Sequence, residues 1–219
     1  MGFPAGLPKT MLVDLSGKFL SADRHVRIAT NMRIYWDRIR VATPVDADIH
    51  VTRLDPTSAN LHFRGYPTYY TPDGHLPWIY DYARIRSVEQ WKTHAGAYTR
   101  FGDVRELLAA RDDKYVITRH GDEISLEFDA GQAPALPRGW VRDYLLYADG
   151  FGKDMDINSL FADTVGPLPF HAMSAFPYPS NEHYPDDEEH LRYQLEYNTR
   201  VYPQAAEPLV LSGGLRANR

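Results

Sequence analysis

The chain has 219 residues, of which 43% are hydrophobic and 24% charged, and its formal net charge is −5. Such a composition is typical of a soluble globular protein and not of a disordered chain. The negative charge disfavours nucleic-acid binding, and no apolar run reaches the roughly 20 residues that cross a bilayer. The chain has no cysteine, which excludes disulfides, thiolate metal ligands and a cysteine nucleophile.

Alternating apolar residues predict short β-strands, because successive side chains of a strand point to opposite faces. The predicted strands are 11–15, 26–30, 34–41, 49–54, 61–64, 115–118, 123–129 and 141–149. Between Trp36 and Ile39 the alternation changes phase, which predicts a bulge near Asp37 or Arg38. The tripeptide at 120–122 predicts a tight hairpin turn between the strands at 115–118 and 123–129.

Two segments have the apolar spacing of short helices. In the first, 103–111, Val104, Leu107 and Leu108 follow an aspartate that could cap the helix. In the second, 186–197, Leu191 and Leu195 are four residues apart. Both helices are predicted to be short additions to a structure built from β-sheets.

The Pro- and Tyr-rich segments 65–99 and 165–185 are predicted to be long loops. Together with the many short strands, they indicate an all-β fold. The predicted architecture is a single domain over 1–219, a β-sandwich of jelly-roll or galactose-binding-like type with two short helices and long loops.

Five motifs, at 27–37, 61–66, 97–104, 142–158 and 165–173, resemble a known family. It is the C-terminal domain of bacterial FG-GAP repeat and ASPIC/UnbV-type proteins, which often occurs with tetratricopeptide repeats. The family offers no catalytic residues to transfer to this chain. The resemblance implies an exported protein, so we expect a periplasmic or extracellular location, although the chain itself contains no signal peptide.

Oxygen-bearing side chains follow the predicted strand at 141–149. Asp149, Asp154, Asp156 and Asn158 are the type of ligand that calcium prefers. The spacing matches the start of a calcium loop, but the glycine after Asn158 and the glutamate at the twelfth position are missing, which excludes an EF-hand. The alternative is that these residues are turn and cap residues beyond a strand.

An alternative metal site is His171 with Met173, two residues further on. In an extended segment both side chains point to the same side, and their chemistry suits copper or haem. Packing in the core is the more common role of such a pair.

Aromatic residues of the segment 65–99 are predicted to form an exposed binding platform, with two arginines as polar anchors. The predicted ligand-binding residues are Arg64, Tyr69, Tyr70, Trp78, Tyr80, Tyr82 and Arg100. The alternative is an aromatic flap folded over one end of the sandwich.

The chain has no nucleophile elbow, phosphate loop or dinucleotide motif. We therefore predict a non-catalytic module that binds a glycan or a protein partner, or an extrinsic subunit docked on a larger assembly. The alternative is a metal-dependent enzyme, a hydrolase, lyase or oxidoreductase, centred on His171 and the loop of Asp154 and Asp156. A purely structural subunit is a third possibility.

Overall fold

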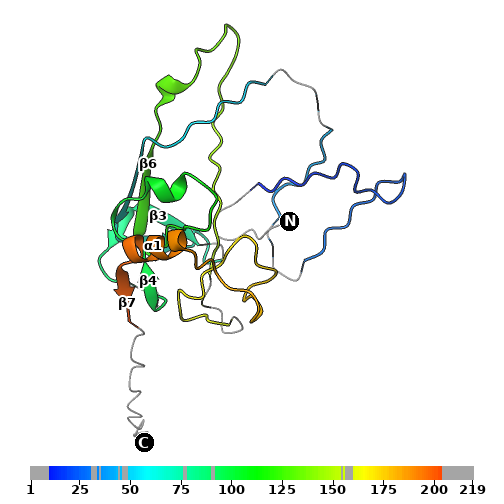
Figure 1. The fold of residues 1–219 in the computed structure, drawn as a ribbon. Coiled ribbons are helices and arrows are strands. Elements are labelled where there is room, and N and C mark those ends of the chain that lie inside the picture. Colours follow the sequence, from blue (N-terminus) through cyan, green and yellow to red (C-terminus); the bar gives the residue numbers. More distant parts are fainter. Residues whose placement is uncertain are drawn as a thin grey trace, which may run out of the picture. The chain divides into compact units, whose positions relative to one another are not determined.

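Figure 1 shows the computed structural model of the chain. It describes residues 10–30, 34, 36–43, 45, 49–75, 78–89, 92–153, 155 and 160–203. The described part is mainly β structure with one α-helix, which confirms the prediction of a mainly-β protein. Its elements in chain order are β1 (Ser58–Phe63), β2 (Tyr66–Tyr70), β3 (Ile79–Arg86), β4 (Gly96–Tyr98), β5 (Gly102–Asp103), the 3-10 helix η1 (Arg105–Leu108), β6 (Asp122–Glu127), the 3-10 helix η2 (Ala130–Gln132), α1 (Glu188–Tyr197) and β7 (Arg200–Tyr202).

The chain forms two compact units. The first comprises 1–51 and 67–84, and the second comprises 52–66 and 85–219. Strands β2 and β3 form a two-stranded sheet that lies almost wholly in the first unit. The described part of the second unit contains a three-stranded sheet in the order β5-β1-β6, a two-stranded sheet of β4 and β7, and α1.

The core of the second unit forms around β1. This strand pairs antiparallel with both β5 and β6, and Leu61 lies opposite Ile124 of β6. Ala59 and Leu61 point to the same face, where they pack with Val104 and are almost completely buried. Burying a side chain of the size of Leu61 contributes about 1.5–3 kcal/mol to the free energy of unfolding.

Helix α1 confirms the helix predicted at 186–197. Asp187 caps it, because its carboxylate accepts hydrogen bonds from the backbone N–H groups of Glu189 and His190. The buried side chains are Tyr193 and Tyr197, which pack with Leu107, whereas the leucines of the predicted apolar face are exposed. None of the helices in the described ranges has the length and apolar character to cross a bilayer.

A turn forms at 120–121, immediately before β6, but it does not join a hairpin, because 115–118 is not in a strand and β6 pairs with β1 instead. Gly121 has a φ of +92°, and a Cβ atom there would lie 2.7 Å from the ring of Phe63 and 2.9 Å from the ring of Tyr66. Only glycine satisfies both the backbone conformation and the close approach. The backbone oxygen of Gly121 accepts hydrogen bonds from the N–H groups of Arg64 and Gly65, which joins the turn to the end of β1.

A nearly buried ion pair joins β6 to β7. Asp122 accepts hydrogen bonds from Nη1 and Nη2 of Arg200 at 3.2 and 2.6 Å. Asp122 also accepts one from the backbone N–H of Arg119, whose own guanidinium donates to Glu89 at 2.9 Å. The side chains of Asp122 and Arg200 are 1% and 12% exposed, so the charges compensate each other away from water.

Several predicted elements differ from the structure. The described residues of 11–15, 26–30, 34–41, 49–54, 115–118 and 141–149 are not in strands, so no bulge arises near Asp37 or Arg38. Alternation selects a face but does not supply the neighbouring strand that a ladder needs. The helix predicted at 103–111 is reduced to the four residues of η1.

The segment 65–99, predicted as a loop, contains β2, β3 and β4. Its Tyr, Thr and Ile residues favour extended structure, and Pro67 is compatible with a strand at the edge of a small sheet. The segment 165–185 contains neither a helix nor a strand, in agreement with the predicted loop.

Candidate functional site

Four of the predicted platform residues meet on the small sheet of β2 and β3. Trp78, Tyr80 and Tyr82 alternate along the chain and therefore point to one face. Tyr69 of β2 joins them, with ring centroids 4.7 Å from Trp78 and 6.1 Å from Tyr80. The rings of Tyr80 and Tyr82 are 6.1 Å apart and stacked. We call these four residues the aromatic face.

The aromatic face is accessible. Trp78 and Tyr82 are 44% and 51% exposed, while Tyr69 and Tyr80 are half-buried between them. Tyr70, also predicted for the platform, is 52% exposed, but it follows Tyr69 in β2 and points to the opposite face of the sheet. The ring contacts therefore include four of the five predicted aromatic residues.

The two predicted arginine anchors belong to the other unit. Arg64 forms an ion pair with Glu123, and this hydrogen bond is the main reason why the pKa of Glu123 lies below its ordinary value. The positive charge of Arg64, which follows the last residue of β1, is therefore compensated by Glu123 of β6. Arg100, in contrast, lines a pocket.

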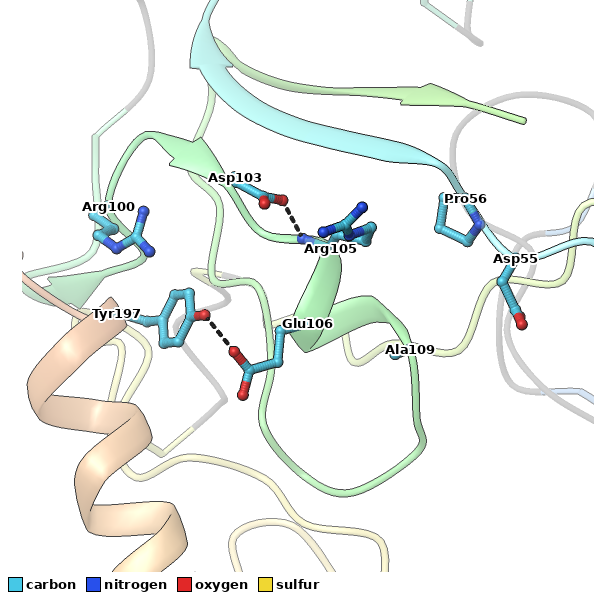
Figure 2. Close-up of a pocket in the computed structure, with 8 residues that line it drawn as sticks. All are labelled: Asp55, Pro56, Arg100, Asp103, Arg105, Glu106, Ala109 and Tyr197. Carbon is cyan, nitrogen blue, oxygen red and sulfur yellow. Dashed lines mark hydrogen bonds between the residues drawn. The ribbon is translucent and has the colours of Figure 1, made fainter. Parts of the chain in front are cut away.

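A pocket of about 360 Å³ lies where η1 approaches the end of α1, and Figure 2 shows the residues that line it. They are Asp55, Pro56, Arg100, Asp103, Arg105, Glu106, Ala109 and Tyr197. The volume is at the small end of the range of ligand pockets. We call this the arginine pocket.

Within the described ranges, the two guanidinium groups of the arginine pocket have no acidic partners. Arg100 lies over the ring of Tyr197, 4.6 Å from its centroid, and Nη1 of Arg105 donates to the backbone oxygen of Thr57 at 3.1 Å. Neither group forms an ion pair with any residue that the structure describes. Both therefore keep most of their donors for a ligand.

The three carboxylates of the arginine pocket each have one partner. Glu106 accepts the hydroxyl hydrogen of Tyr197 at 2.9 Å, Asp103 accepts the backbone N–H of Arg105 at 2.9 Å, and Asp55 pairs with Arg53 at 3.1 Å. Burial, followed by the hydrogen bond to Glu106, raises the pKa of Tyr197, so its hydroxyl stays protonated and donates. Each carboxylate retains further acceptor capacity.

His171, the centre of the alternative metal site, lies between two carboxylates. Its Nδ1 is 2.5 Å from Oδ1 of Asp113, and its Nε2 is 3.3 Å from Oδ1 of Asp149, which also pairs with Arg111. The ring nitrogens are therefore engaged in what we call the His171 clamp, which connects three separate segments.

The carboxylates of the His171 clamp have perturbed acidities. Burial alone would raise the pKa of Asp113, but hydrogen bonds from the backbone and ring of His171 and from Tyr115 outweigh it and lower the pKa. The hydrogen bond from His171 is the largest reason for the lowered pKa of Asp149, and the charge of Arg111 adds to it. Both groups are thus stabilised as anions.

Three of the four predicted calcium ligands, Asp154, Asp156 and Asn158, lie outside the described residues. Asp149 is described and belongs to the His171 clamp. Met173 donates its backbone N–H to the oxygen of Phe170. In the part of the chain that the structure describes, no group of three or more His, Asp or Glu side chains has an arrangement suited to a metal ion.

Arg100 is among the residues predicted from the sequence, but its neighbours in the arginine pocket, Arg105, Glu106 and Tyr197, are not. Tyr197 is 91 residues from Glu106, so no local pattern connects them. The acidic residues near Arg105, Asp103 and Glu106, are a weak signal, because acidic residues are common at helix N-termini.

Comparison of the chain with protein-family models, curated proteins and solved structures finds no match. The resemblance to FG-GAP repeat and ASPIC/UnbV-type proteins therefore stays a prediction.

Proposed function

We propose that the protein is a non-catalytic carbohydrate-binding module, with the aromatic face as its binding surface. The observation that carries this proposal is the contact among Tyr69, Trp78, Tyr80 and Tyr82 on one side of the β2-β3 sheet, with Trp78 and Tyr82 about half exposed. Fully buried rings would serve packing, whereas these retain surface for a ligand.

The chemistry of these side chains suits a sugar. The C–H face of a pyranose ring stacks on an aromatic ring, while its hydroxyl groups exchange hydrogen bonds with tyrosine hydroxyls. A row of rings along one strand favours consecutive residues of an oligosaccharide over a single monosaccharide. The ring contacts also fix the side-chain rotamers before binding, which lowers the entropic cost of association.

Two further features complete this proposal. The finer architecture is a β-sandwich of jelly-roll or galactose-binding-like type, a fold class that commonly presents ligands at its rims. The location is periplasmic or extracellular, as the family resemblance implies, and there the module would meet polysaccharides. A binding role is also consistent with the lack of a catalytic motif in the sequence.

Titration with soluble β-1,4-linked hexasaccharides of glucose and of N-acetylglucosamine tests the proposal, with tryptophan fluorescence and calorimetry as readouts. Replacement of Trp78 by alanine should weaken binding about threefold to tenfold, because one ring contact contributes about 0.5–1.5 kcal/mol. Tyr82→Ala should act in the same direction.

Tyr70→Ala is the matched control, because Tyr70 is equally exposed on the same sheet but points to the opposite face. It should leave the affinity unchanged. If neither hexasaccharide binds, or if Tyr70→Ala weakens binding as much as Trp78→Ala does, the aromatic face is not a glycan site.

A further inference from the structure

The charges around the arginine pocket determine which small ligands it can accept. Arg100 and Arg105 contribute two positive charges, and Asp55, Asp103 and Glu106 contribute three negative ones. A simple anion that pairs with the guanidinium groups meets three carboxylates, and a simple cation that pairs with the carboxylates meets two arginines. A ligand that carries one charge of each sign can pair with both kinds of group, so that the attraction at each end offsets these repulsions.

We infer that the arginine pocket binds a free α-amino acid with an apolar side chain. The carboxylate of the ligand pairs with the guanidinium of Arg100, whose fork of N–H donors matches the two oxygens. The ammonium group of the ligand pairs with the carboxylate of Glu106. Pro56 and Ala109 supply the apolar part of the lining.

Tyr197 organises both charged ends of this site. Its ring lies against the guanidinium of Arg100, and its hydroxyl donates to Glu106 at 2.9 Å. Figure 2 shows the tyrosine between the two charged groups. Because one buried side chain contacts both groups, their positions are coupled before a ligand arrives, and less ordering is needed on binding.

The backbone supports the same arrangement. The N–H of Arg100, two residues after β4, donates to the backbone oxygen of Tyr197, the last residue of α1, at 2.6 Å. Glu106 and Arg105 are on η1, which packs through Leu107 against Tyr193 and Tyr197. The site therefore stands on packed elements of one unit, and a volume of about 360 Å³ equals roughly a dozen water molecules.

The inference is independent of the proposed carbohydrate site, because the two sets of residues belong to different units. The test uses three ligands with one carbon skeleton: L-leucine, isoamylamine, which lacks the carboxylate, and 4-methylpentanoate, which lacks the ammonium group. Each is titrated into the full chain, and binding is followed by calorimetry and by shifts of backbone amide resonances in NMR spectra.

L-Leucine should bind and shift the amide signals of η1 and the end of α1, and each analogue should bind at least about tenfold more weakly. Arg100→Gln and Glu106→Gln should each reduce the affinity for leucine by a similar factor. Arg192→Gln, on an exposed position of α1 outside the pocket, should leave it unchanged.

Equal affinity for leucine and 4-methylpentanoate would show a simple anion site and overturn the inference. Equal affinity for leucine and isoamylamine would show a cation site, with the same consequence. Lack of binding by leucine would remove the amino-acid site altogether. Glu106→Gln also changes the group that accepts the hydrogen bond of Tyr197, so a loss of affinity in this variant could have a structural cause. The comparison of the three ligands on the unmodified chain tests the inference without any variant.

Discussion

Asp122 connects parts of the second unit that lie far apart in the sequence. It binds Arg200, 78 residues away, and caps the turn that begins β6. A carboxylate with so little exposure is stable only while its partners remain in place. The pairing with Arg200 therefore contributes to the position of β7 beside β4.

Asp122→Asn should lower the free energy of unfolding by about 3–5 kcal/mol, because the positive charge of Arg200 is left without its carboxylate in a largely buried site. Urea unfolding followed by circular dichroism measures the change. The matched control is Asp163→Asn, which breaks the exposed ion pair with Lys92 and should cost less than about 1 kcal/mol. Similar losses in both variants would argue against a special role of burial.

The His171 clamp predicts a pH dependence of stability. Asp113 and Asp149 have lower pKa values in the folded protein than in the unfolded chain, so their contribution is fully present above the unfolded value of about 4. This contribution to the free energy of unfolding is lost as the pH falls through the lower pKa values that Asp113 and Asp149 have in the folded protein.

Asp113→Asn should therefore reduce stability near neutral pH, and its difference from the unmodified chain should shrink below about pH 4. Unfolding in urea at a series of pH values measures this difference. Asn at position 113 also tolerates the positive φ of 64° found there, which makes it a suitable replacement. If the difference in the free energy of unfolding between the two proteins grew toward acid pH, the predicted direction of the pH dependence would be wrong.

At the scale of elements, similar sequence patterns have different outcomes. Both 61–64 and 141–149 were predicted as strands, but 61–63 belong to β1 between β5 and β6, whereas 141–149 are not in a strand. Leu61 is completely buried, and Leu145 is 98% exposed. The difference arises from neighbouring strands and not from the segments themselves.

Leu61→Ala should lower the free energy of unfolding by about 2–5 kcal/mol, because it removes buried methyl groups and leaves a cavity between β1 and η1. Leu145→Ala deletes the same atoms at an exposed position and should change stability by less than about 0.5 kcal/mol. Thermal and urea unfolding of the two variants compare them directly. A large loss for Leu145→Ala would show that 141–149 packs against a partner.

At the scale of the whole molecule, the two units carry the two proposed sites, so each can be tested without disturbing the other.

The calcium hypothesis also belongs to this scale, because a cation that binds only the folded chain stabilises all of it. It predicts a higher Tm in calcium than in chelator, and it predicts that Asp156→Asn abolishes the difference. Equal melting curves under both conditions would reject calcium binding by the loop of 149–158.

Local pattern was enough to predict the mainly-β character, α1, and the strands around Leu61 and Ile124. These features depend on the spacing of residues within one segment, which strand and helix geometry converts directly into a shared face. The segment of Trp78, Tyr80 and Tyr82 was predicted as a loop, and the strand that aligns their side chains came only with the structure. Arg100, predicted as an anchor beside the aromatic residues, lines the arginine pocket in the other unit, and its role in binding stays a prediction.

Only the tertiary structure decided which segments pair and which charged residues meet. The arginine pocket combines Arg100, Glu106 and Tyr197, and the ion pair of Asp122 with Arg200 spans 78 residues. Such pairs depend on how strands and helices are brought together, and the free energy of that assembly comes from burial of distant apolar surfaces such as those of Leu61 and Tyr193. No local pattern encodes these contacts, because each partner alone looks like an ordinary surface residue.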